Sequence, residues 1–306
     1  MKILLIADRE GWAYDILAKS IKSHSKYKNI EIKYLVNIRD NIDQEDFTEH
    51  DIVYFFLWYD AMRYGPRIKG FNFAKTCVGI HSHGWKKRGL TAQQTKQICE
   101  QFSAAGYISE ELGELLRLEN GFYTPNGVEK SIFYPSEFPD LDEIRVMWVG
   151  NPGNHHHGEN KGFNSIIKPA IGELSQYNIK LVTATPENPV SRENMGDFYR
   201  ENHVLLCSSR EEGGPMPVIE SLACGRPVIS TKVGVVPEFV TDGVNGLIIE
   251  RTKKAFVECL TQIIKNKRIL QDISIGAAQS SQSIYCESMV QNYDKMFEYV
   301  NKSSGI

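Results

Sequence analysis

The chain has 306 residues, which is longer than one ordinary domain and suits two domains of about 140 residues each. Its hydrophobic fraction of 42% is sufficient for ordinary cores. Its formal net charge of −3 excludes nucleic acid as the default partner, and no apolar run approaches the roughly 20 residues that span a bilayer. The six cysteines form no CxxC pair. The apolar stretch at the N-terminus ends before Asp8 and is too short for a signal peptide, so we expect a cytoplasmic protein.

Strand-type and helix-type segments alternate along both halves of the chain. Helical patterns cover 13–23, 91–102 and 253–265, among others. Such alternation is typical of parallel sheets with helices on both faces, so we expect an α/β fold with Rossmann-like domains. The strand-type runs begin near residues 2, 30, 52, 76, 106, 145, 179, 203, 227 and 246.

The segment 135–143, rich in proline and acidic residues, predicts the domain boundary. It divides the chain into an N-terminal domain, 1–138, and a C-terminal domain, 139–284. The last segment, 285–306, carries apolar residues at amphipathic helical spacing and is treated separately.

The loop after the strand-type run 203–207 is the most informative part of the chain. It leaves the carboxyl end of a predicted parallel strand, where open α/β sheets bind ligands. Gly213 and Gly214 let the backbone approach a ligand closely. Pro215 suits the entry of a helix, where a missing N–H costs little. The loop therefore predicts a ligand site.

Two carboxylates and a helix start define the chemistry of this loop. The N–H groups from Met216 to Ile219 predict an anion site for phosphate. Glu220, one turn into the helix, is suited to accept hydrogen bonds from sugar hydroxyls, and Glu212 could serve a second sugar. A bare pair of glutamates at this spacing would indicate only solvated side chains, but the glycines, prolines and preceding strand favour a sugar-nucleotide site.

The segment from about 196 to 250 resembles the donor-binding half of family 4 retaining glycosyltransferases of the GT-B fold. Weaker similarity lies upstream, in 123–135, in 146–150 with Lys161, and in His81 after the apolar run 77–80. The first 75 residues match in pattern only. The main match runs through Phe198, Tyr199, Ser208, Ser209, 212–215, 219–228, Pro237, Glu238 and 242–246.

This resemblance implies two Rossmann-like domains around a central cleft, with the acceptor on 1–138, the donor on 139–284, and the C-terminal helix crossing back to the first domain. It implies a hexosyltransferase-type enzyme that moves a sugar from a nucleotide-sugar, first of all a UDP-sugar, with retention of configuration. The acceptor would be a glycan, a lipid-linked molecule or a protein. No metal or other cofactor is expected, and the departing phosphate oxygen would take the acceptor's proton.

The resemblance also assigns roles to residues. Lys161 would neutralise the diphosphate leaving group, and His81 would lie near the reacting sugar; with Glu212 they form the expected catalytic set. Asn151 stands in the donor site where the family usually offers an arginine, and Arg210 or the helix N-terminus would compensate.

Gly11 joins the donor-binding set on the loop after the first strand, where the family commonly carries two glycines. Two motifs are set aside. Residues 155–157 are three consecutive histidines that cannot readily all face one ion, and Asp140-Leu-Asp142 spells DxD in a linker rather than in a metal site.

Three alternatives stay open. The protein could be a GT-B sugar-nucleotide epimerase, which needs no acceptor, or a non-catalytic protein that binds a sugar-nucleotide or glycan. The basic stretches 85–88 and 19–33 could touch anionic lipid headgroups, giving peripheral contact with the inner membrane face, or could be solvated helix faces.

Overall fold

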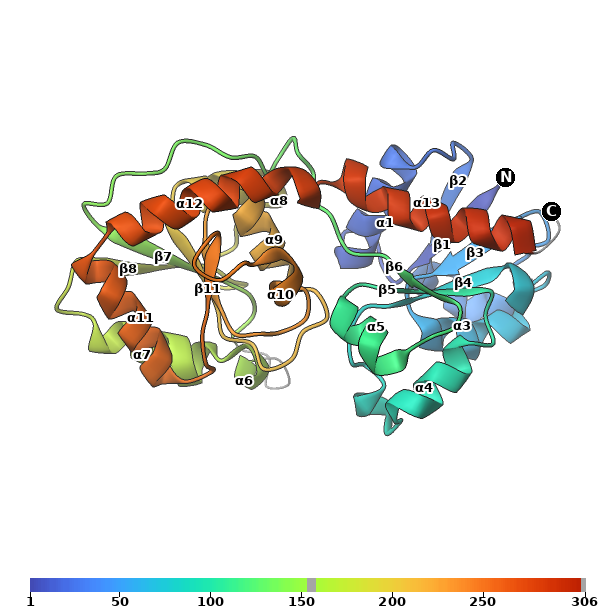
Figure 1. The fold of residues 1–306 in the computed structure, drawn as a ribbon. Helices are drawn as coiled ribbons and strands as arrows, with labels where there is room; N and C mark the ends of the chain where they lie inside the picture. The colour runs from blue at the N-terminus through green and yellow to red at the C-terminus, as the bar shows by residue number, and fades with distance from the viewer. Residues whose placement is uncertain (153–157, 304–306) are drawn as a thin grey trace. The chain divides into compact units, whose positions relative to one another are not determined.

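The computed structural model describes residues 1–152 and 158–303. The chain folds into two compact units. Unit 1 comprises Met1–Gly127 and the residues from Cys286 on, and unit 2 comprises Val128–Tyr285 (Figure 1). None of the described helices combines the length and the apolarity needed to cross a membrane.

Unit 1 is built on a parallel sheet in the order β2-β1-β3-β4-β5-β6. Each predicted strand start lies within two residues of an observed one, and the sequence misses only the short β6 among these strands. The strands are β1 (Ile3–Ala7), β2 (Ile30–Tyr34), β3 (Ile52–Phe55), β4 (Thr76–Ile80), β5 (Ala104–Tyr107) and β6 (Gly121–Tyr123).

Helices cover both faces of this sheet. On one face α1 (Ala13–His24) and α13 (Cys286–Ser303) share a core with the sheet (Figure 1). The apolar positions 289, 293, 296, 297 and 300 of α13 are all buried, which explains why the C-terminal helix packs on unit 1, as the sequence predicts. The remaining α-helices described here are α2 (Leu35–Ile38), α3 (Trp58–Tyr64), α4 (Ala92–Cys99) and α5 (Glu110–Leu116).

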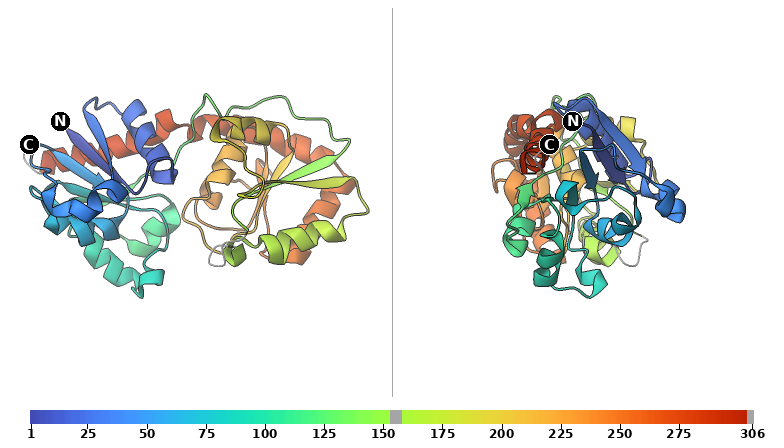
Figure 2. Two further views of the ribbon diagram at one scale, coloured as in Figure 1. Left: turned by 180° about the vertical axis from the view of Figure 1, so that it is seen from behind. Right: turned by 90° about the vertical axis from the view of Figure 1, so that its right-hand side faces the viewer.

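Unit 2 repeats the architecture with a parallel sheet in the order β11-β10-β9-β7-β8. Helices lie on both faces of this sheet (Figure 2). The strands are β7 (Ile144–Val149), β8 (Ile179–Ala184), β9 (Val204–Cys207), β10 (Val228–Ser230) and β11 (Gly246–Ile248). The helices are α6 (Gly158–Lys161), α7 (Lys168–Glu173), α8 (Arg192–Arg200), α9 (Met216–Ala223), α10 (Val236–Phe239), α11 (Lys253–Lys265) and α12 (Arg268–Ser280).

The division between the units differs from the sequence expectation. It falls after Gly127 and Tyr285, whereas the sequence placed it after residues 138 and 284. The reason is a buried cation: Arg226, 0% exposed, donates hydrogen bonds to the carbonyls of Ser136 and Glu137 at 3.2 and 2.8 Å. The proline-rich segment is therefore a packed part of unit 2 rather than a free linker.

Candidate functional site

The loop 208–215 is fixed at the carboxyl ends of β7, β9 and β10. Ser208 Oγ donates to the Lys161 carbonyl at 2.6 Å, and Thr231 Oγ1 donates to the Ser209 carbonyl at 2.6 Å. A Cβ on Gly234, which has φ 49°, would lie 2.4 Å from the Gly213 carbonyl oxygen. Only a glycine lets the segment after β10 approach the loop so closely.

Helix α6 is joined to the same loop through Asn160. Its amide Nδ2 donates to the Glu211 carbonyl at 2.7 Å, and its backbone carbonyl accepts from the Arg210 N–H at 2.8 Å. Arg251 closes the arrangement, because its Nε donates to the Ser208 carbonyl at 2.8 Å. Sequence reasoning missed both Asn160 and Arg251, since their partners lie 43 to 51 residues away.

Lys161 and Glu212 form the centre of the site. Lys161 Nζ lies 2.9 Å from Glu212 Oε1, and Ser209 Oγ donates to the same oxygen at 3.0 Å. The side chains are 25% and 20% exposed, so the pair is partly shielded but accessible. A Cβ on Gly150 would lie 3.1 Å from Lys161 Cδ, so the glycine that follows β7 leaves space for the lysine. Two of the predicted residues are thus brought into contact.

Glu220 is directed elsewhere. It is 6% exposed and accepts hydrogen bonds from the Tyr199 hydroxyl at 2.9 Å and from Arg192 Nη1 at 3.4 Å. Burial raises its pKa, against the opposing effect of Arg192. Glu212 of the loop and Glu220 of α9 therefore have separate partners, and the role of Glu220 toward a sugar stays a prediction.

The start of α9 offers fewer N–H groups than the sequence predicts. Pro217 has none, and the Val218 N–H donates to the Pro215 carbonyl at 2.9 Å. Asn151 and Arg210 are exposed beside Gly150 and the loop. In unit 1, Gly11 has φ 78°, and its N–H donates to Asp15 Oδ2 at 2.8 Å, so this glycine serves the local turn.

His81 follows β4 in unit 1. Its ring lies 4.8 Å from the ring of Tyr14, and its Nε2 is buried. Burial lowers the pKa of His81 to about 3, so the imidazole is neutral at physiological pH. His83 is 5% exposed, with Glu111 Oε1 3.4 Å from its Nε2, which fits a structural role.

Two further carboxylates lie in unit 1, and the sequence did not single them out. Asp8 follows β1, and its Oδ1 is buried without a hydrogen-bond partner among the described residues. Asp60 lies in α3, and burial, assisted by Asp8, raises its pKa to about 6 against the effects of Arg88 and Arg63. Only the fold reveals the raised pKa of Asp60, because it comes from burial.

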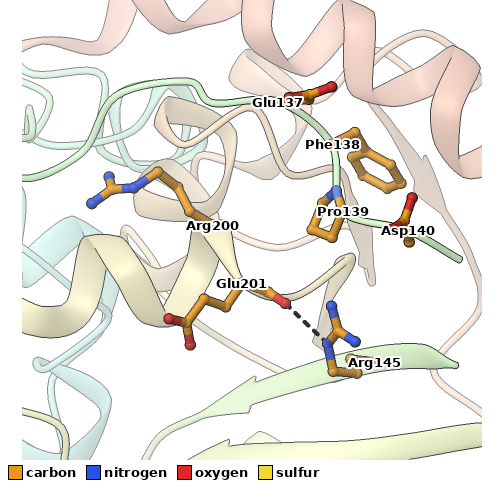
Figure 3. Close-up of a pocket in the computed structure, with 7 residues that line it drawn as sticks. All are labelled: Glu137, Phe138, Pro139, Asp140, Arg145, Arg200 and Glu201. Atoms are coloured by element: carbon orange, nitrogen blue, oxygen red, sulfur yellow. Dashed lines mark hydrogen bonds between the residues drawn. The ribbon is translucent and has the colours of Figure 1, made fainter.

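A pocket of unit 2, of about 630 Å³, lies at the amino end of β7 (Figure 3). Arg145 Nε donates there to the Glu201 carbonyl at 2.9 Å, and the Arg200 side chain points away from the pocket. This hollow is separate from the loop 208–215, which lies at the carboxyl ends of the strands. Its lining residues are Glu137, Phe138, Pro139, Asp140, Arg145, Arg200 and Glu201.

The two motifs that could suggest a metal give no site in the described part of the chain. Asp140, of the DxD sequence, lines the hollow of Figure 3. Across residues 1–152 and 158–303, no group of three or more His, Cys, Asp or Glu side chains is placed to hold a metal ion. The histidines 155–157 lie outside the described residues.

Comparison with known proteins shows similarity to glycosyltransferases. Residues 175–280 match the family model described as "Glycosyl transferases group 1". An uncharacterized glycosyltransferase from Methanocaldococcus jannaschii is 27% identical over 235 residues, covering 68% of this chain and 60% of the relative. A D-inositol 3-phosphate glycosyltransferase from Mycolicibacterium vanbaalenii is 28% identical over 128 residues, covering 36% of this chain and 25% of the relative. The chain thus spans at most 60% of these curated relatives.

Solved structures show the same fold along the whole chain. A sucrose-phosphate synthase from Thermosynechococcus elongatus superposes with a TM-score of 0.71 at 14% identity, covering 99% of this chain and 100% of that one. HepE from Anabaena, in complex with UDP, gives 0.73 at 12% identity, covering 97% and 100%. The fold is therefore GT-B, and the expected similarity to group 1 glycosyltransferases is confirmed; family 4 is a finer assignment.

Proposed function

We propose that the protein is a family 4 glycosyltransferase that moves a sugar, with retention of configuration, from a nucleotide-sugar to an acceptor. The observation that carries the proposal is the Lys161–Glu212 pair at 2.9 Å, held by the loop at the carboxyl ends of β7 and β9. A lysine ammonium is a point charge suited to a diphosphate, and a carboxylate beside it suits sugar hydroxyls.

A UDP-sugar is the first donor to test, because UDP is bound in the HepE structure that shares this fold. Lys161 would stabilise the charge that develops on the leaving diphosphate. The departing phosphate oxygen would then take the acceptor's proton on the same face, which requires neither a protein base nor a metal. Glu212 would position the transferred sugar.

The acceptor is proposed to bind unit 1, near His81, and to be a glycan, a lipid-linked molecule or a protein. Contact with a membrane through the basic stretch 19–33 is less favoured than the sequence suggests. Lys19 pairs with Asp15 at 2.8 Å, Lys26 pairs with Glu298 at 2.7 Å, and Lys33 pairs with Glu45. These acidic partners neutralise part of the positive charge of the stretch 19–33, which weakens its attraction to anionic lipid headgroups. We therefore propose a cytoplasmic location without membrane contact through this stretch.

The test is nucleotide release from a panel of UDP-, GDP- and ADP-sugars, with and without EDTA. We expect one donor to be turned over in EDTA, and the activity to be lost in Lys161→Ala and Glu220→Ala. Lys253→Ala is the matched control, because Lys253 also pairs with a glutamate, Glu173, but at the start of α11.

Other outcomes separate the alternatives. Conversion of the donor to an isomeric sugar-nucleotide without an acceptor would establish an epimerase instead. Tight binding of a donor with neither hydrolysis nor transfer, across a broad acceptor panel, would establish a non-catalytic binding protein. Absence of binding to any sugar-nucleotide would overturn the donor site.

A further inference from the structure

Three polar atoms converge above Gly79 in β4. A Cβ placed on this glycine would lie 2.5 Å from His81 Nε2, 2.5 Å from the Tyr54 hydroxyl and 2.6 Å from the Phe56 carbonyl oxygen. The arrangement follows from the register, because Tyr54 of β3 lies beside Cys77, and residues two apart in a strand point to the same face. A side chain at position 79 would occupy the space that these atoms share.

Two of the three atoms lack a partner. The Tyr54 hydroxyl and His81 Nε2 are both buried with no hydrogen bond among the described residues. Leaving a buried polar atom unsatisfied destabilises the folded protein. A tyrosine hydroxyl donates one proton, and a neutral imidazole accepts at one nitrogen. One hydrogen bond, direct or through a single bridging water, would satisfy both atoms.

The surroundings favour this pairing. The Tyr14 and Phe56 rings lie 4.8 and 6.1 Å from the His81 ring and limit its rotation. The neighbouring Tyr293 hydroxyl donates to the Thr124 carbonyl at 3.4 Å, so its oxygen remains a competing acceptor for the Tyr54 proton. If Nε2–H instead donated to the Phe56 carbonyl, the Tyr54 proton would need the second lone pair of that oxygen, or the Tyr293 oxygen, as its acceptor.

We propose that Tyr54 is a positioning residue for His81: its hydroxyl donates to Nε2, which places the single imidazole proton on Nδ1. His81 then presents an N–H donor, while uncharged, at the carboxyl end of β4. Such a donor suits an oxygen of a sugar or a developing negative charge. The inferred tautomer is independent of any reaction, whereas its use in catalysis rests on the proposed function.

The tautomer can be measured directly. In protein labelled with ¹⁵N-histidine at pH 7.5, long-range ¹⁵N–¹H correlation spectra distinguish the protonated ring nitrogen, and His81→Gln identifies the His81 signals. We expect the proton on Nδ1 in the wild type and a shift of the proton toward Nε2 in Tyr54→Phe. Tyr293→Phe, which removes the neighbouring buried hydroxyl, is the control and should leave the His81 signals unchanged. A proton on Nε2 in the wild type, or an unchanged spectrum in Tyr54→Phe, would overturn the proposal.

The catalytic consequence has its own readout. With the donor found in the panel, Tyr54→Phe should lower kcat by about tenfold, a fraction of the effect of removing a donor outright, and leave KM for the donor unchanged. An unchanged kcat would refute a role of the tautomer in the reaction. If no donor is turned over, the proposed function fails while the spectra still decide the tautomer.

Discussion

Glu212 and a bound diphosphate compete for the same ammonium, that of Lys161. The substitution Glu212→Gln keeps the size and hydrogen-bonding capacity of the side chain but removes its charge. We expect Glu212→Gln to bind a nucleoside diphosphate, or inorganic pyrophosphate, more tightly than the wild type does. Turnover of the full donor should fall, because the carboxylate that would hold the sugar is lost.

The magnitude follows from the geometry. Two unit charges 2.9 Å apart attract by roughly 6 kcal/mol at an effective dielectric constant of about 20. Desolvation and screening remove most of this, because the two side chains keep 25% and 20% exposure. A net value of about 1 kcal/mol remains, so the affinity for the diphosphate should rise about fivefold. Lys161→Ala should weaken the binding of the diphosphate by about tenfold or more.

Isothermal titration calorimetry with UDP and with pyrophosphate measures both effects. Glu173→Gln is the matched control, since Glu173 also pairs with a lysine of unit 2, Lys253, at the start of α11. In the double variant Lys161→Ala/Glu212→Gln the gain from the glutamine should vanish, because its origin is the freed lysine. Unchanged or weaker diphosphate binding in Glu212→Gln would refute the reasoning.

Three further predictions concern burial and charge. The pKa of His81 is lowered to about 3, so below pH 6.5 this histidine is protonated in the unfolded chain but stays neutral in the folded protein. The wild type therefore loses stability between pH 7 and pH 5. His81→Gln should lose less over this range, by about 1–2 kcal/mol in the free energy of unfolding measured in urea. The pKa of Asp60 is raised to about 6, so the wild type loses stability as the pH rises from about 4 to 6. Asp60→Asn should therefore raise Tm at pH 7 but not at pH 4. An equal change of Tm at both pH values would contradict this prediction. Arg226 is fully buried, and it donates hydrogen bonds to the Ser136, Glu137 and Arg200 carbonyls. Arg226→Ala should therefore destabilise unit 2 by about 3 kcal/mol or more. An unchanged thermal transition in differential scanning calorimetry would contradict this prediction.

The sequence by itself determined the α/β alternation, the positions of most strands, the amphipathic helix near residues 287–300 and the ligand loop 208–215. These features depend on local periodicity and on turn residues, which a linear reading detects. The family resemblance added Lys161 and His81. Local patterns could not show that residues 128–138 pack with unit 2, because the cause is Arg226, far along the chain.

The tertiary structure decided which charged groups meet. Glu212 and Glu220 lie eight residues apart in sequence, yet one pairs with Lys161 and the other accepts from Tyr199. Such choices depend on the order of strands in the sheet and on burial, and both bring together residues that lie far apart in the chain. For the same reason the pKa of Asp60, and the convergence of Tyr54 and His81 above Gly79, exist only in the folded protein.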